Sequence, residues 1–248
     1  MESPNDNPKW ILEPPSNCME LESNIDCLNF LYRKGKFYIM DNHLAAGWCW
    51  LNTLNKQKEY GFIHIDQHND CINNKNLALC QDILLKDELT LFEYTSLCLD
   101  GEKVFIWDNY ILQIRQLLPE WFKGARFSTR KEPRREDIET QFNPSAIDLL
   151  SKIKSFVPGT NNDYILNLDI DYFFDDNGVR TSTDDEIRQL AQEIKRLLPN
   201  IAVITIALSP DCCEHDGDGW QNAIEAMTVL DKELSLGFVD ELKSRIQQ

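Results

Sequence analysis

The chain lacks paired-cysteine motifs and long apolar runs, and each absence argues against one class of protein. Its eight cysteines include no CxxC pair and no spacing typical of a small disulfide-stabilised domain, so we expect reduced thiols in a cytoplasmic protein. No stretch of about 18 apolar residues occurs, and the first residues show no basic segment followed by an apolar core. The sequence therefore predicts a soluble protein with neither a membrane span nor an export signal.

Basic residues are also few. Lys and Arg number 25 against 41 Asp and Glu, which gives a formal net charge of -16. This balance argues against nucleic acid or an anionic membrane as the main partner and favours a cationic substrate. The only basic cluster, residues 127–139 with Arg130, Lys131, Arg134 and Arg135, is interpreted as a solvated loop, with recognition of an acidic peptide segment as the alternative.

No internal repeat or low-complexity linker divides the 248 residues, so we expect one domain spanning 1–248. Short apolar runs alternate with helical patterns. The expected strands are 37–40, 62–65, 104–107, 164–168 and 201–208. The expected helices are 43–54, 108–118, 144–156, one capped by Thr183 that ends before Pro199, and one from Trp220 onward that breaks at Gly237. This rhythm predicts a three-layer α/β/α fold with a mainly parallel sheet.

Two expected strands turn abruptly acidic where they end. Asp66, His68 and Asp70 follow strand 62–65, and Asp169 and Asp171 follow strand 164–168. The carboxyl ends of parallel strands meet at one edge of a sheet, so these side chains are expected to converge. A single Asp-x-Asp after a strand is more often a turn and helix cap. Several aspartates brought together would repel one another without a cation, so the combination predicts a metal site.

Only four histidines occur, and three of them neighbour acidic motifs. His43 follows strand 37–40, His68 lies between two aspartates, and His215 follows strand 201–208 beside Glu214. His64 lies within an apolar strand, so it is interpreted as a hydrogen-bonded core residue or as a support for a metal ligand. Four strand ends therefore carry candidate ligands or catalytic groups.

In order and spacing, His43, the Asp66-x-His68-x-Asp70 motif and the Asp169-x-Asp171 motif resemble the arginase and ureohydrolase superfamily over residues 37–216. The resemblance implies an arginase-like fold and two Mn²⁺ ions. Carboxylate oxygens and imidazoles suit that metal. His43, Asp66, Asp70 and Asp169 would hold one ion, and Asp66, His68, Asp169 and Asp171 would hold the other.

Among the branches of this superfamily, the chain looks most like the peptide arginases, which convert arginine side chains of ribosomally made precursor peptides to ornithine and release urea. Ordinary arginases bind the free amino acid through a loop after the DxHxD motif that includes a histidine, whereas residues 71–81 contain none. The resemblance thus implies a metal-dependent hydrolase of the guanidino C–N bond, with an arginine-containing precursor peptide as partner. A ureohydrolase of free arginine or agmatine and a noncatalytic metal-stabilised domain that binds arginine-containing peptides remain the alternatives.

Two further roles are carried over from the family by position. Glu214 is expected to pair with the guanidinium group, with Asp211 or Asp216 as alternatives, because a carboxylate offers two acceptors to that planar cation. His215 is expected to deliver a proton to the leaving amine, with His64 as the alternative. Cys212 and Cys213 are interpreted as packing residues, since nothing in the sequence indicates an activated thiolate.

Overall fold

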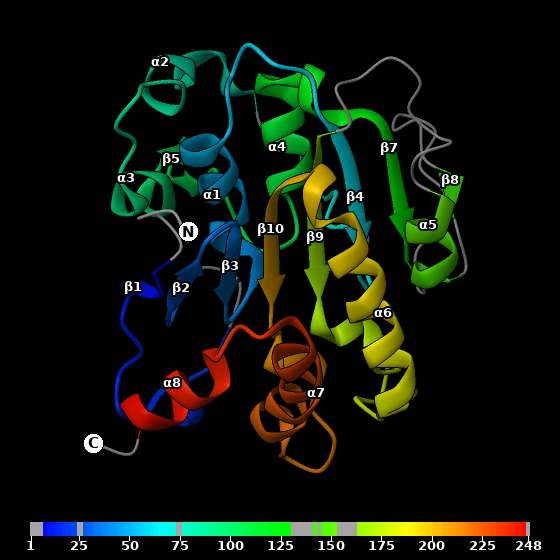
Figure 1. Cartoon of the computed structure of the whole chain (residues 1–248). Coiled ribbons are helices and arrows are strands. Elements are labelled where there is room, and N and C mark those ends of the chain that lie inside the picture. Colours follow the sequence, from blue (N-terminus) through cyan, green and yellow to red (C-terminus); the bar gives the residue numbers. More distant parts are fainter. Residues whose placement is uncertain are drawn as a thin grey trace.

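The computed structural model describes residues 7–23, 27–72, 76–129, 141–142, 145–152 and 163–246. These residues build an eight-stranded sheet with the order β1-β2-β3-β10-β9-β4-β7-β8 (Figure 1). Its strands are β1 (Lys9–Leu12), β2 (Leu31–Lys34), β3 (Phe37–Met40), β4 (Gly61–Ile65), β7 (Lys123–Ser128), β8 (Gln141–Phe142), β9 (Tyr164–Asp169) and β10 (Ile201–Ala207). The pairs β1–β2 and β2–β3 are antiparallel, and every other pair is parallel. The predicted α/β fold with a mainly parallel sheet is confirmed.

Helices cover both faces of the sheet. One core contains residues of α5 (Ala146–Lys152), α6 (Asp184–Leu197), α7 (Gly219–Leu234) and α8 (Phe238–Ile246). The other contains residues of α1 (Ala46–Thr53), α2 (Gln81–Leu84), α3 (Leu91–Ser96) and α4 (Tyr110–Leu117). In β4, Ile63 and Ile65 pack into the first core and Phe62 into the second, as the two-residue period of a strand requires. The result is three layers, α/β/α.

Short 3₁₀ helices and one hairpin complete the described structure. The 3₁₀ helices are η1 (Cys18–Glu20), η2 (His43–Ala45), η3 (Leu77–Leu79), η4 (Pro119–Phe122), η6 (Ile170–Phe173), η7 (Leu198–Asn200) and η8 (Pro210–Cys212), and the hairpin strands are β5 (Cys98–Leu99) and β6 (Glu102–Lys103). Three of the 3₁₀ helices, η2, η6 and η8, come within a few residues of the ends of strands β3, β9 and β10, at one edge of the sheet. Among the described residues, no helix is both long and apolar enough to cross a membrane.

Helix α6 shows how local sequence sets an element. Thr183 accepts a hydrogen bond from the backbone of Glu186, whose side chain accepts one from the backbone of Thr183, so the predicted capping box is present. Ile187 and Ile194 are buried on the face that packs on the sheet. The predicted break at Gly237 is also confirmed, because this residue lies between α7 and α8 with a φ of 69°, a backbone conformation that glycine adopts without strain.

The predicted strand at 104–107 is wrong. Val104 and Phe105 are buried, as the apolar pattern suggested, but the segment is a loop that leads into α4. The side chain of Asn109 donates to the Val104 carbonyl at 3.0 Å and accepts from the Ile106 amide at 3.0 Å. These side-chain hydrogen bonds satisfy backbone groups that a neighbouring strand would otherwise satisfy.

Other boundaries differ modestly from the expectation. The helix predicted from residue 43 begins as η2 and becomes α-helical at Ala46. Strands β1, β2 and β7 were not predicted, and the proposed basic loop starts inside β7 at Phe127. The four basic residues named for that cluster, Arg130, Lys131, Arg134 and Arg135, lie outside the described residues, as does the end of the helix predicted over 144–156.

Candidate metal centre

Three parallel strands of the sheet, β3, β4 and β9, bring the predicted metal ligands to the same edge, and β10 lies between β3 and β9. In the sheet, Ala207 of β10 pairs with Met40 of β3 and with Asp169 of β9, and Ile65 of β4 pairs with Leu168 of β9. The carboxyl ends of these strands are therefore level. All six predicted ligands lie at or just after these strand ends: His43, Asp66, His68, Asp70, Asp169 and Asp171.

His43 is the centre of the first group of ligand atoms. Its Nδ1 lies 2.9 Å from Asp70 Oδ2 and 3.4 Å from both Asp66 Oδ2 and Asp169 Oδ2. The candidate ligand atoms of His43, Asp66 and Asp70 all lie within 4.8 Å of one another, and all three side chains are buried. This group matches three of the four ligands predicted for one ion.

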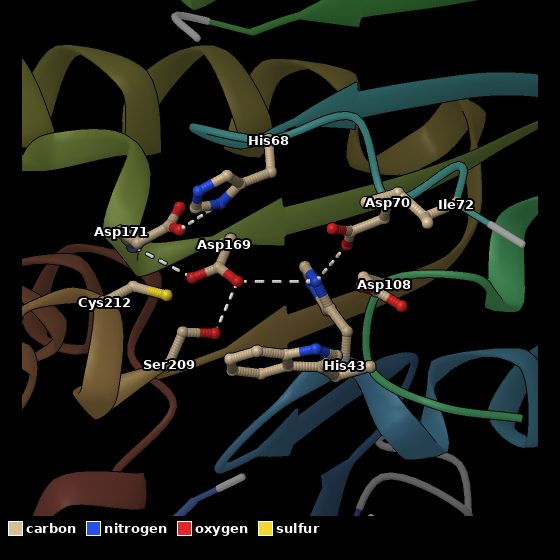
Figure 2. Close-up of a pocket in the computed structure, with 10 residues that line it drawn as sticks. His43, His68, Asp70, Ile72, Asp108, Asp169, Asp171, Ser209 and Cys212 are labelled. Carbon is tan, nitrogen blue, oxygen red and sulfur yellow. Dashed lines mark hydrogen bonds and ion pairs between the residues drawn. The ribbon is translucent and has the colours of Figure 1, made fainter. Parts of the chain in front are cut away.

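A second group lies beside the first and shares Asp66 with it. Ligand atoms of Asp66, Asp169 and Asp171 fall within 4.8 Å of one another. His68 Nδ1 is 3.0 Å from Asp171 Oδ2 and 3.6 Å from Asp66 Oδ1. The structure thus brings together the ligands predicted for the second ion, and Asp66 and Asp169 lie where the two sets meet. Figure 2 shows Asp169 between His43 and Asp171.

Two turns with a left-handed backbone conformation direct one carboxylate and one hydroxyl group toward the candidate metal centre. Asp70 has a φ of 49° and Ser209 a φ of 42°, values that residues other than glycine rarely adopt. In these turns Asp70 faces His43, and Ser209 Oγ donates to Asp169 Oδ2 at 2.5 Å. Strain of this kind is characteristic of functional sites, where surrounding contacts hold the backbone in place.

A buried amide supports the site from within the sheet. Asn167 of β9 places its Nδ2 3.2 Å from His43 Nε2, 2.9 Å from His64 Nδ1 and 2.8 Å from the Tyr110 hydroxyl, while its Oδ1 accepts from Thr205 at 2.6 Å. An amide nitrogen carries two hydrogens, so at most two of the three groups accept from it at once. Tyr110 in turn donates to Asp70 Oδ2 at 2.8 Å. His64 therefore lies behind the ligands as a supporting residue, as its position in the strand suggested.

Charge crowding shifts the pKa values of these groups. Burial raises the pKa of Asp169 to about 7, and the charge of Asp171 adds to this shift. Burial also raises the pKa of Asp66 well above its usual value. Burial alone would lower the pKa of His43, but Asp169 and Asp70 outweigh it and raise that pKa. For Asp70, burial favours a higher pKa, but the hydrogen bond and charge of His43, the charge of His64 and the hydrogen bond from Tyr110 together outweigh it, and the pKa falls.

The donor set fits divalent cations. Asp66 Oδ2 and Asp171 Oδ2 are buried and accept no hydrogen bond from the described residues. A buried carboxylate oxygen without a hydrogen bond is costly unless a cation compensates its charge. Two imidazoles and four carboxylates suit such ions. These buried His and Asp groups could therefore bind metal ions.

A cavity of about 180 Å³ opens over the centre. Five of its lining residues were not predicted as site residues: Ile72, Trp107, Asp108, Ser209 and Cys212. Ser209 could have been found, because it closely follows the clearest predicted strand. Trp107 and Asp108 were not recognised, because the sequence analysis placed them at the junction of a strand at 104–107 and a helix over 108–118, where the structure has a loop.

Glu214 and His215 do not line this cavity. Glu214 borders a separate hollow together with Met19 and Trp220. His215 has a half-exposed side chain, and its Nε2 lies 3.5 Å from Asp216 Oδ2. Asp211, the alternative partner for a guanidinium, also lines the hollow with Glu214. The roles predicted for Glu214 and His215 stay predictions.

The fold and the site together define a class: an α/β protein with a mainly parallel sheet and a buried His/Asp cluster, able to hold metal, at the carboxyl ends of its strands. Among solved structures, the chain is distantly similar to the arginase of Helicobacter pylori, with 14% identity over 79% of this chain and 71% of that one and a TM-score of 0.45. It is also similar to a hypothetical agmatinase from Burkholderia thailandensis, with 12% identity over 79% of this chain and 57% of that one and a TM-score of 0.46. No family model and no curated protein matches the sequence.

Proposed function

We propose that this chain is a binuclear metal-dependent hydrolase that removes urea from the arginine side chain of a precursor peptide and leaves ornithine. The observation that carries the proposal is the convergence of His43, the Asp66-x-His68-x-Asp70 motif and the Asp169-x-Asp171 motif at one cavity, which all of these ligands except Asp66 line. Two bound divalent ions, which we propose to be Mn²⁺, would supply a water of lowered pKa beside the guanidinium carbon.

The walls of the cavity suit a guanidinium group. Trp107 and Asp108 both line it, and Figure 2 shows the Asp108 carboxylate on the side of His43 and Asp70. An indole face attracts a cation, and a carboxylate accepts hydrogen bonds from a planar guanidinium. We therefore propose that these two residues bind the substrate; Glu214, which the sequence analysis suggested for pairing with the guanidinium group, does not line this cavity.

The size of the cavity supports a side chain as substrate. Its volume of about 180 Å³ is below the roughly 300–1,000 Å³ of pockets for drug-sized ligands, so it admits one slender group rather than a whole large molecule. The cavity-lining residue Ile72 is 41% exposed, so it forms part of a rim that reaches the surface. An arginine side chain could enter from that rim while its peptide backbone stays outside.

Urea release from three substrates tests the proposal. Purified, manganese-loaded protein is offered a peptide with an internal arginine, agmatine and free arginine, and mass spectrometry follows the peptide. We expect urea from the peptide and a loss of about 42 Da per converted arginine, the mass of the CN₂H₂ unit removed. Turnover of agmatine or free arginine alone would instead support a small-molecule ureohydrolase. Two tightly bound ions without turnover of any of the three would leave a binding role and contradict the proposal.

Asp108→Asn is predicted to weaken substrate binding while leaving the metals in place. Loss of one charged hydrogen-bond acceptor should lower kcat/KM for an arginine peptide about 10- to 100-fold, mainly through KM. Metal content, measured by mass spectrometry of the elements, should stay the same. Asp87→Asn is the control, because it removes the same charge from an exposed site away from the cavity. Equal KM values in the two variants would exclude Asp108 from substrate binding.

A further inference from the structure

We propose that Cys212 is a metal ligand, so that the ion held by His68 and Asp171 also binds sulfur and this position prefers a thiophilic ion such as Zn²⁺ to Mn²⁺. The inference rests on the metal centre of the proposed function and departs from its uniform manganese content. It assigns a role to a residue that the sequence suggested was only packing.

The geometry separates Cys212 from its neighbour Cys213. Cys213 is fully buried, and its thiol lies 3.6 Å from the Leu208 carbonyl, as expected for a packing residue. Cys212 is partly exposed and lines the cavity. Figure 2 shows its sulfur pointing toward Asp171 and Asp169.

The ligand atoms of His68, Asp171 and Cys212 form a group of their own, because all lie within 4.8 Å of one another. In a tetrahedral zinc site, a Zn–S distance of about 2.3 Å and a Zn–N distance of about 2.0–2.1 Å place the two ligand atoms about 3.6 Å apart, so atoms within 4.8 Å of one another need to approach by about 1 Å. A small side-chain rotation is thus enough to bring all three onto one ion. Figure 2 shows them on one side of the cavity, with Asp70 and Asp108 on the other.

A second observation points to a cation at this position. Asp171 is 1% exposed and lines the cavity, yet its Oδ2 accepts no hydrogen bond from the described residues. This oxygen lies 3.0 Å from His68 Nδ1 without forming a hydrogen bond to it. An ion bound between the imidazole, the carboxylate and the thiolate would satisfy this oxygen.

The donor chemistry then divides the two positions. The position around His43 is surrounded by the carboxylates of Asp66, Asp70 and Asp169, which are hard oxygen donors suited to manganese. A thiolate at the other position favours Zn²⁺, Co²⁺ or Cd²⁺, because sulfur is a soft ligand. The structure therefore predicts a centre with two different affinities rather than two equivalent ions.

The backbone that carries Cys212 is held firmly. Cys212 closes η8, and its amide donates to the Ser209 carbonyl at 3.0 Å. Two glycines lie directly against the same segment: a Cβ on Gly178 would be 2.0 Å from the Glu214 carbonyl oxygen, and one on Gly219 would be 2.3 Å from the Pro210 carbonyl oxygen. Such close backbone packing keeps the thiol over the site.

Cobalt spectroscopy tests the assignment without reference to activity. Chelator-treated protein is reloaded with Co²⁺, and ultraviolet absorption from sulfur-to-cobalt charge transfer is recorded for the wild type, Cys212→Ser, Cys212→Asp and Cys98→Ser. Cys98 is an exposed cysteine outside the cavity and serves as the matched control. Circular dichroism verifies that each variant folds, and elemental analysis gives the bound metal per chain.

We expect the sulfur band in the wild type and Cys98→Ser and its loss in both Cys212 variants. In competition, the preference for Zn²⁺ over Mn²⁺ should fall at least about tenfold in Cys212→Asp, where an oxygen replaces the sulfur. A wild type that binds cobalt without the band, or a band that persists in Cys212→Ser, would overturn the assignment. An unchanged metal preference in Cys212→Asp would also count against it.

The outcomes separate this inference from the proposed function. A wild type that shows the band but releases no urea from any guanidino substrate keeps Cys212 as a ligand and removes the hydrolase. Urea release by Cys212→Ser with cobalt bound and no change in the spectrum keeps the hydrolase and removes Cys212. A protein that binds no divalent ion at all overturns both.

Discussion

Asp169→Asn is expected to abolish tight binding of the metal pair and to lower kcat/KM for arginine hydrolysis by at least about 10³-fold. Asp169 lies where the two ligand groups meet, 3.4 Å from His43 Nδ1, and its other oxygen accepts from the Asp171 amide at 2.9 Å. Asparagine has the same shape but lacks the charge that a shared carboxylate contributes to two cations. Metal stoichiometry by elemental analysis and urea release are the measurements.

Asp163→Asn is the matched control for this variant. Asp163 stands just before the same strand, β9, at the end opposite the site, where it forms an ion pair with Lys58. The pair is partly exposed, so its loss should cost no more than about 1 kcal/mol of stability. Normal metal content and urea release by Asp169→Asn would remove Asp169 from the centre, and with it the proposed two-ion arrangement.

Metal addition is expected to raise the melting temperature much more at pH 7.5 than at pH 5. Burial raises the pKa of Asp169 from 3.8 to about 7, so the folded metal-free protein holds a proton between these values that the unfolded chain has released. The contribution of Asp169 to stability is therefore most favourable below the lower pKa and is lost as the pH rises through the upper one. Divalent ions replace that proton and restore the stability that the metal-free protein loses at higher pH.

The size of the effect follows from mass action. An ion at 100 times its dissociation constant adds about 2.7 kcal/mol, which corresponds to roughly 5–10 °C in a chain of this length. Thermal unfolding with Mn²⁺ or Zn²⁺ and with a chelator, across pH 5 to 7.5, measures it. In the metal-free protein, Asp169→Asn should reduce the dependence of the melting temperature on pH only in part, because burial also raises the pKa of Asp41 to about 6. An equal rise in melting temperature on metal addition at pH 5 and at pH 7.5 would contradict the proposal that the ions replace the proton of Asp169.

The fold could be predicted where one face of an element is uniformly apolar or a cap is written in the sequence. Strand β3 (Phe37–Met40) and helix α6 (Asp184–Leu197) are cases of this kind. The 104–107 segment misled the prediction because buried apolar residues also occur in loops when side chains such as Asn109 satisfy the backbone. Strand β7 was missed, since its start at Lys123 and Gly124 has no strand pattern.

The candidate metal ligands could be predicted because strand ends impose proximity, and His43, Asp66 and Asp169 each follow a strand of the same sheet. The other residues that line the cavity could not be predicted in this way. Cys212 reaches the site through a left-handed turn at Ser209, and no sequence pattern marks that turn. Which side chains border a cavity depends on loop conformation, and a residue number near a strand end, as for Glu214, does not determine it.

The contact of Gly178 with the backbone of Glu214 has a consequence for protein engineering. It joins the loop after Asp171 to the loop after β10, although the two are far apart in the chain. Any attempt to redesign substrate preference by loop exchange should transplant both loops together, with Gly178 and Gly219 kept. A library that varies one loop alone would sample mostly backbones that collide with the other.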